Sequence, residues 1–185
     1  MSLSIAIRSW FSLPEDNDWL MEKYVISQRP EYLEKLYDNC ADDLFHFLLS
    51  QSDYHLAQDI SQKTWLRVID KRHLFHSQQY FKSWLFTIAR NLLIDDLRHS
   101  KRLIACDDVD IEVTVSTPDN QTLKTTFDQA LLMLPFNQRE AFILQQEGFS
   151  INDIAHITNT EAETIKSRLR HAKRQLRTQL EHLHE

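Results

Sequence analysis

A single glycine, Gly148, is the feature of this 185-residue chain that most limits what it can fold into. A typical protein of this length has about 13 glycines, because glycine makes up roughly 7% of residues. β-Hairpin turns often need glycine for positive φ angles, and phosphate-binding loops need several glycines close together. Helices joined by short connections need few. The deficit therefore predicts an all-α protein without a glycine-rich phosphate or dinucleotide loop.

Charge alternates along the chain in four blocks, although the net charge is only -6. The blocks 1–63, 64–103, 104–163 and 164–185 carry net charges of -6, +5, -9 and +4. A polyanion responds to the local field of a protein rather than to its total charge. The two basic blocks suggest two separate contacts with DNA, although on charge alone solvated helix faces are the simpler explanation.

Composition excludes several classes of protein. No apolar run approaches the roughly 18 residues that span a membrane, and residues 1–14 do not resemble a signal peptide. Cys40 and Cys106 form no CxxC pair, which indicates reduced thiols in a cytoplasmic protein. The nine histidines are scattered, and His182 and His184 are two residues apart, a spacing that does not share a helix face. We therefore expect no metal, no cofactor and no enzymatic activity.

Apolar periodicity divides the chain into parts. From Pro30 onward, apolar residues recur three and four positions apart, which predicts helices up to about residue 48, over 54–70 and over 80–102. The stretch Asp107–Asn120 has five carboxylates, no Lys or Arg and no helical period, so it is expected to be a linker. The expected parts are an N-terminal extension (1–28), a helical domain (29–102), an acidic flexible linker (103–123) and a second helical domain (124–185).

Three capping signals divide the second domain into short helices. In each, an N-cap side chain precedes a carboxylate by three residues, a pattern that satisfies free N–H groups at a helix start. After a helix near 127–134, three more are expected at about 138–147, 151–157 and 161–180. A two-turn helix, a short turn and a longer basic helix are typical of a helix-turn-helix. The three pairs are Asn137 with Glu140, Ser150 with Asp153, and Thr160 with Glu163.

The last expected helix separates apolar from basic residues. At 100° per residue, its apolar positions form one narrow stripe, and a basic face rich in hydrogen-bond donors lies opposite. Such a face suits the major groove of DNA. A solvated cationic helix end is the alternative, which the preceding turn and caps disfavour. The stripe consists of Ile165, Leu169, Ala172 and Leu176.

Two blocks of sequence resemble bacterial sigma factors of the extracytoplasmic-function (ECF) group, in the sigma-70 family of RNA polymerase. Ala57–Val68 and Phe81–Arg98 are similar to sigma region 2, and Leu134–Leu169 is similar to sigma region 4. The blocks stand in the family's order with no domain between them, as in the ECF group. The resemblance implies an all-α protein of two small helical domains that binds core polymerase, recognises the -10 and -35 promoter elements and directs initiation for a stress or envelope regulon.

The resemblance implies that the helix over 57–69 docks on the β′ clamp helices of core polymerase. It also implies a contact of the second domain with the β flap and a path of the acidic linker towards the RNA exit. Positions 58 and 63 are more often acidic in the family, so the chemistry of the polymerase contact is shifted here. A solvated face is the alternative. The polymerase-binding candidates are Gln58, Asp59, Gln62 and Lys63.

The helix over 80–98 and the loop before it resemble the part of the family that recognises and melts the -10 element. Single-stranded bases are held by stacking and by donors on a basic surface, and upstream phosphates position the protein. Phe86 is a candidate for base stacking or for the rim of the core, whereas Trp84 is expected in the core. The -10 candidates are His76, Ser77, Gln78, Gln79, Lys82, Phe86, Arg90, Asn91, Arg98, Lys101 and Arg102.

The final helix resembles the reader of the -35 element. The family usually has glycine in the turn of this helix-turn-helix, where the chain has Asn159. Asparagine is the residue other than glycine that best tolerates left-handed backbone, so the turn should be kept. The -35 candidates are Lys166, Ser167, Arg170, His171 and Arg174, with Thr164 and Arg168 as phosphate or helix-start contacts.

Two points stay open at this stage. The alternative function is a dimeric helix-turn-helix regulator that does not act through polymerase. The block over 57–98 disfavours this alternative, because such a regulator would not need that block. The resemblance also implies an anti-sigma factor as a partner, without identifying one. Residues 1–28 could take part in that regulation or pack against the first domain.

Overall fold

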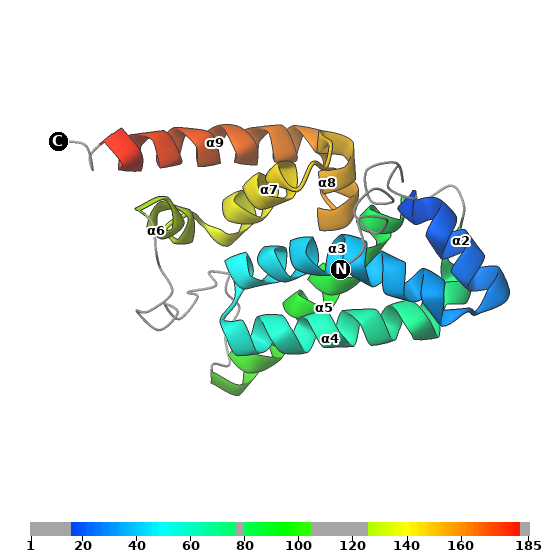
Figure 1. The fold of residues 1–185 in the computed structure, drawn as a ribbon. Coiled ribbons are helices and arrows are strands. Elements are labelled where there is room, and N and C mark those ends of the chain that lie inside the picture. Colours follow the sequence, from blue (N-terminus) through cyan, green and yellow to red (C-terminus); the bar gives the residue numbers. More distant parts are fainter. Residues whose placement is uncertain (1–15, 77–79, 105–125, 182–185) are drawn as a thin grey trace, which may run out of the picture.

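The computed structural model describes residues 16–76, 80–104 and 126–181, which form eight α-helices and one 3-10 helix without a β-strand (Figure 1). The prediction of an all-α protein with two small helical domains is confirmed. No helix in these ranges is long and apolar enough to cross a membrane. The expectations for residues 1–15, the linker stretch 105–125 and Cys106 lie outside the described residues.

The first domain packs three long helices and a shorter N-terminal one around a shared apolar core. Leu36 and Phe47 of α3 and Leu85 of α5 are fully buried there. Phe81 is also buried, whereas Trp84 is only partly so. α5 continues two residues beyond 102, where we expected the linker to begin. The elements are α2 (Asn17–Ser27), α3 (Pro30–Gln51), α4 (Tyr54–Lys71), the 3-10 helix η1 (Arg72–Leu74) and α5 (Phe81–Ile104).

The second domain contains the expected helix-turn-helix. Its longest helix, α9, runs along the outer edge of the molecule, and α6, α7 and α8 lie between it and the first domain (Figure 1). The predicted apolar stripe of this helix is buried, with Ile165 and Ala172 wholly enclosed. The elements are α6 (Thr126–Leu132), α7 (Phe136–Gln146), α8 (Ile151–Thr158) and α9 (Ala162–Glu181).

One of the three predicted caps forms as expected. The Ser150 hydroxyl accepts from the Asp153 N–H, and the Asp153 carboxylate accepts from the Ser150 N–H, which makes a complete capping box. The prediction for Asn137 is wrong, because α7 begins two residues earlier than expected, at Phe136, and Pro135 occupies the N-cap position without a side-chain bond. Thr160 lies just before the start of α9, and its hydroxyl instead shares a 2.8 Å hydrogen bond with Thr158.

The two tight turns of the second domain use the residues that the sequence indicated. Gly148 follows α7 with a φ of +88°, and the next N–H, of Phe149, bonds back to the Leu144 carbonyl. Asn159 ends α8 with a φ of 51° and a ψ of 51°. Both are left-handed positions that close a helix, so both predictions are confirmed.

We expect Gly148→Ala to lower the free energy of unfolding by about 1 kcal/mol, because a Cβ disfavours left-handed backbone. Nothing lies within 4 Å of the added Cβ, so the loss comes from the backbone alone. Urea denaturation followed by far-UV circular dichroism measures it. Asn159→Gly is the control and should be no less stable than the wild type; a Gly148→Ala variant as stable as the wild type would contradict the prediction.

Candidate nucleic-acid interfaces

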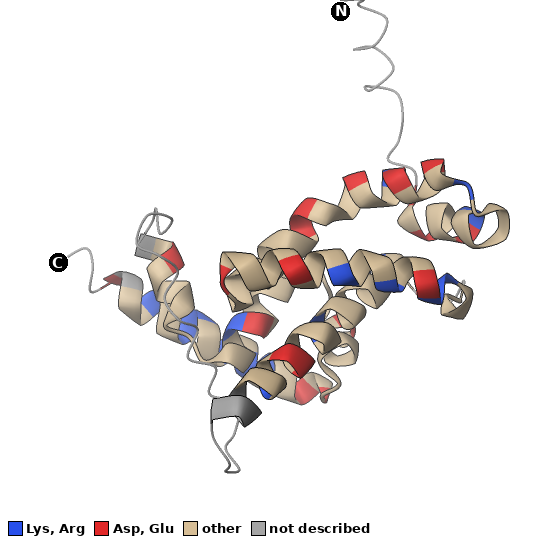
Figure 2. Ribbon diagram, turned by 90° about the horizontal axis from the view of Figure 1, so that it is seen from below, with Lys and Arg blue, Asp and Glu red and all other residues tan. Residues whose placement is uncertain are grey.

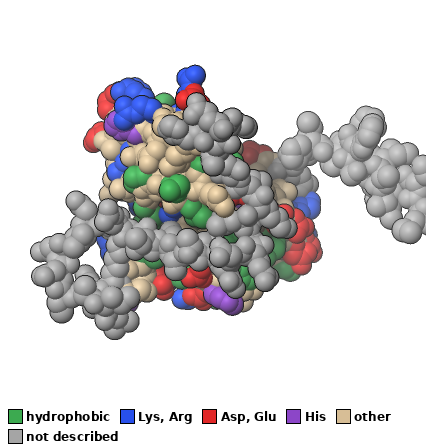
Figure 3. Space-filling view, turned by 90° about the vertical axis from the view of Figure 1, so that its left-hand side faces the viewer, with side chains coloured by type: hydrophobic (Ala, Val, Ile, Leu, Met, Phe, Trp, Pro, Cys, Tyr) green, Lys and Arg blue, Asp and Glu red, His purple; other side chains and the backbone are tan. Residues whose placement is uncertain are grey.

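The outward face of α9 is basic and exposed. Lys and Arg residues recur along this helix, which leads to the C-terminus (Figure 2), and basic side chains gather at the upper edge of the molecule in the space-filling view (Figure 3). Lys166 forms a 2.6 Å surface ion pair with Glu163, which holds the pKa of that carboxyl below its usual range. The buried stripe and the α8 turn fix the direction of this face. The predicted -35 residues that it exposes are Thr164, Lys166, Arg170, His171 and Arg174, with Ser167 partly buried.

Arg168 differs from its neighbours because it points towards the inside of the molecule. It is partly buried, its Nη1 lacks a partner among the described residues, and burial lowers its pKa. The charges that it senses are those of Glu140 and Arg90. The structure therefore places Arg168 beside the contact between the domains rather than on the exposed face where we expected a phosphate contact.

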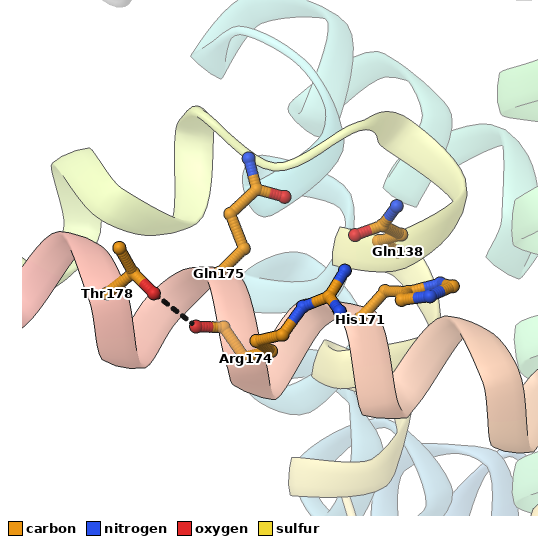
Figure 4. Close-up of a pocket in the computed structure, with 5 residues that line it drawn as sticks. All are labelled: Gln138, His171, Arg174, Gln175 and Thr178. Carbon is orange, nitrogen blue, oxygen red and sulfur yellow. Dashed lines mark hydrogen bonds between the residues drawn. The ribbon is translucent and has the colours of Figure 1, made fainter.

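A shallow polar cleft of about 480 Å³ lies between α7 and α9. Gln138 comes from α7 and the other lining residues come from α9, where Thr178 donates to the Arg174 carbonyl at 3.2 Å (Figure 4). Two of its residues, His171 and Arg174, are -35 candidates, so the cleft borders the basic face. No cluster of three His, Cys, Asp or Glu side chains that could hold a metal occurs in the described part of the chain.

The predicted -10 residues of α5 divide into two sets. Asn91 and Arg98 are exposed, as is His76 before the helix. Lys82 and Arg90 instead face the second domain, and Phe86 is fully buried rather than on the polar face. Ser77, Gln78 and Gln79 lie outside the described residues, as do the side chains of Lys101 and Arg102.

A buried ion pair joins α5 to α7. The Arg90 Nε donates to Glu140 Oε1 at 2.7 Å, and its Nη2 donates to Oε2 at 3.3 Å. The Glu140 side chain is 0% exposed and that of Arg90 is 14% exposed. Burial raises the pKa of the Glu140 carboxyl, although Arg90 and Arg168 act in the opposite direction. Two parallel hydrogen bonds make this a strong and directional contact.

Lys82 forms a second bridge between the domains. Its Nζ lies 2.7 Å from Asp43 Oδ2 and 3.1 Å from the Glu147 carbonyl oxygen. The same ammonium lies within 6 Å of the ring centroids of Phe86 and Phe149, close enough for cation–π attraction. Those two rings meet edge to face at 4.9 Å. Phe86, for which base stacking and the rim of the core were both open, therefore packs on the second domain.

Arg139 is a buried cation that the sequence did not indicate. Its Nε donates to the Gln51 side chain at 3.3 Å, and its Nη1 donates to the Leu132 carbonyl at 3.0 Å. The residue is 1% exposed, and burial lowers its pKa to about 10. Because Gln51 ends α3, Arg139 connects the first domain to α7.

The candidate polymerase face lies on α4, away from the second domain. Gln58, Asp59, Gln62 and Lys63 are all exposed, and Asp59 forms an ion pair with Lys63. Leu66 follows on the same face and is 58% exposed. An apolar side chain among polar ones gives this surface a hydrophobic centre, which protein interfaces commonly have.

Tyr80 is an exposed aromatic residue that sequence reasoning missed. It stands immediately before α5 and is 70% exposed. We counted it only as the start of a helix, and helical periodicity gives no signal for a residue outside the repeat. It is available for stacking, whereas Phe86 is not.

The comparisons with known proteins place both halves of the chain in one family. The family models for Sigma-70 region 2 and Sigma-70 region 4 match residues 36–103 and 124–176. The ECF RNA polymerase sigma factor SigM of Bacillus subtilis is 33% identical over 153 residues, which cover 78% of this chain and 93% of SigM. EcfG of Rhodopseudomonas palustris is 37% identical over 124 residues, with 65% and 68% covered.

Solved structures agree with the sequence matches. The sigma factor RpoE of Bartonella quintana, in complex with the anti-sigma factor NepR, has a TM-score of 0.68 and 29% identity, and the match covers 83% of this chain and 98% of RpoE. CnrH, in complex with the cytosolic domain of CnrY, has a TM-score of 0.66 at 16% identity over 89% of this chain and 97% of CnrH. The likeness to CnrH shows the fold.

We expect Glu140→Ala to weaken the contact between the domains by about 3–5 kcal/mol, because Arg90 would keep its charge in a desolvated position without a partner. Small-angle X-ray scattering should show an increased radius of gyration. The control is Glu163→Ala, which removes an equally short ion pair from an exposed site and should leave the radius unchanged. An unchanged radius for the Glu140→Ala variant would contradict the prediction.

Proposed function

The chain belongs to the ECF group of the sigma-70 family. We propose that its first domain binds core polymerase and recognises the -10 element, and that its second domain recognises the -35 element. The chain binds core RNA polymerase and recognises promoter DNA, a function that requires no catalytic step on this chain and that is carried out in the cytoplasm. The observation that carries the proposal is the exposed basic face of α9, the second helix of a helix-turn-helix whose first helix is capped by Ser150. The same chain also contains region 2.

α9 is proposed to read the -35 element. Its exposed Lys166, Arg170 and Arg174 lie on one face, and the short α8 sets this face outward. Arginine is the commonest side chain to read guanine in the major groove, because it reaches two acceptors at once. Thr164, Ser167 and His171 extend the same surface.

α5 is proposed to recognise the -10 element with two kinds of residue. Asn91 and Arg98 are exposed and free to meet DNA in the structure as it stands. Tyr80 is proposed to stack on an unpaired base, the role that we had considered for Phe86. Support comes from its 70% exposure directly after the sequence His76–Gln79, which resembles the part of the family that recognises and melts the -10 element.

The face of α4 is proposed to bind the β′ subunit of core polymerase. Leu66 supplies an apolar contact at one end of this face, and Gln58, Gln62 and the Asp59–Lys63 pair precede it along the helix. Because these residues lie away from the contact between the domains, they are open to polymerase even when the two domains are packed together. The contact of the second domain with the β flap remains part of the proposal.

The domain contact implies that promoter binding changes the arrangement of the two domains. Lys82 and Arg90 are -10 candidates, and both are engaged in the contact between the domains, Lys82 with the Glu147 carbonyl and Arg90 with the Glu140 carboxylate. We infer that the second domain moves away from α5 before these two side chains meet DNA. An anti-sigma factor is the partner proposed to control this step, because the similar RpoE structure contains one.

In vitro transcription tests the proposed function. Core polymerase and the purified protein are combined with a library of genomic fragments, and the transcripts are mapped by sequencing. We expect transcripts that start at sites sharing a -10 and a -35 element, and none from core polymerase alone. Absence of promoter-specific transcripts under all conditions would refute the proposal. A dimeric regulator, which the comparisons do not favour, would bind duplex DNA without giving transcripts.

Arg170→Ala tests the proposed -35 reader. If the side chain contacts a base, its loss should weaken use of the preferred -35 sequence by about 1–3 kcal/mol and relax preference at one position. Competition binding against a set of single-substitution duplexes measures both effects. The control is Arg177→Ala, which removes an equally exposed cation that is paired with Glu181 near the end of α9. An equal loss on all sequences would reassign Arg170 to a phosphate.

A further inference from the structure

The N-terminal helix α2 lies outside the matched family regions, which begin at residue 36, yet it is tightly built into the first domain. Leu20 and Met21 are 0% exposed and belong to the core. At the start of the helix, Asn17 accepts from the Asn39 side chain at 2.8 Å and donates to the Cys40 sulfur at 3.4 Å. The first turn of α2 is therefore fixed against α3.

Among the described residues at the start of α5, no side chain of the segment itself caps the helix. The Tyr80 carbonyl accepts from the Trp84 N–H, so Tyr80 stands at the N-cap position. Tyrosine is not among the residues that cap a helix, because its hydroxyl lies at the far end of a rigid ring and cannot accept from the N–H groups of the first turn. The Tyr80 side chain therefore does not satisfy the first N–H groups of the helix that carries the -10 candidates, and an acceptor from another helix can do so.

Asp18 of α2 supplies that acceptor across 63 residues of sequence. Its Oδ1 accepts from the backbone N–H of Phe81, the first residue of α5. Partial burial raises the pKa of this carboxyl, although the bond from Phe81 opposes the shift. The Asp18 carboxyl is thus placed where desolvation disfavours its charged form. The bond to the Phe81 N–H offsets part of that cost.

We propose that Asp18 is a positioning residue for promoter melting: by capping α5 from a second helix, it fixes the start of the helix that engages the -10 strand. This inference rests on the proposed function. Asp18 does not touch DNA itself. The Asp18 carboxylate holds the backbone at Phe81. The held backbone in turn orients the neighbouring Tyr80, whose exposed ring is the proposed stacking surface. Rigid support of a binding side chain reduces the ordering that binding would otherwise require.

The test compares Asp18→Ala, Asp18→Ser and Asp18→Asn in holoenzyme with core polymerase, on a promoter mapped by in vitro transcription. A 2-aminopurine base in the -10 element reports the rate of strand opening. Alanine has no acceptor and should slow opening about fivefold or more, whereas asparagine keeps an oxygen at the same place and should open within about twofold of the wild type. Serine, with a shorter acceptor, should fall between them. Binding of core polymerase and of a -35 duplex should stay within about twofold for all three.

The matched control is Asp16→Ala. Asp16 caps α2 itself, by accepting from the Asp18 N–H, and makes no bond to α5. Its replacement should lower the thermal midpoint at least as much as Asp18→Ala while leaving the opening rate within about twofold. Equal slowing by Asp16→Ala and Asp18→Ala, or failure of Asp18→Asn to restore opening, would overturn the proposal by showing that only the stability of α2 matters.

The wild-type holoenzyme separates failure of this inference from failure of the proposed function. A wild-type protein that opens no promoter would refute the proposed function and this inference together. Normal opening by both the wild type and the Asp18→Ala variant would refute the role of Asp18 alone.

Discussion

The most deeply buried charged contact between the two domains is the ion pair between Arg90 of α5 and Glu140 of α7. Burying two charges costs much of what their attraction returns, so such a pair adds little net stability, but the loss of one partner costs about 3–5 kcal/mol. The pair therefore acts mainly on specificity: it fixes which face of α5 meets the second domain. At this contact the basic block 64–103 meets the acidic block 104–163, since Arg90 pairs with Glu140 and Lys82 lies 4.0 Å from the Glu147 carboxylate.

Local features of the fold could be predicted from the sequence because their causes are local. The left-handed turns at Gly148 and Asn159, the capping box at Ser150 and the buried stripe of α9 each follow from residues within a few positions of one another. The cap expected at Asn137 failed for the opposite reason. Its partner in the pattern, Glu140, is drawn to an arginine 50 residues away, and spacing along the chain carries no information about that contact.

The candidate sites show the same division. The exposed faces of α4 and α9 follow from helical periodicity alone, whereas the orientation of α5 depends on a second domain that covers part of it. Phe86 has the spacing of a partly exposed position, but Phe149 packs against it and buries it. The burial of Arg139 left no sign in the sequence pattern, because Gln51 and the Leu132 carbonyl reach it only in the folded chain. Hydrophobic pattern determines which residues are buried within a domain, but not which polar residues lie between domains.

The two kinds of support for α5 respond differently when the domains separate. The bonds of Lys82 and Arg90 to the second domain must break before these cations can meet phosphates. Arg90 then loses its carboxylate partner, whereas Lys82 keeps its ion pair with Asp43 inside the first domain. The bond from Phe81 to Asp18 lies wholly within the first domain, as does the anchoring of α2 through Asn17 and Asn39. Separation therefore removes the contacts along the side of α5 while leaving its start in place. α5 is then released along one face but still held at its N-terminus, so Tyr80 is presented from a fixed backbone. Its exposed ring can stack on an unpaired base without the cost of first ordering the backbone that carries it.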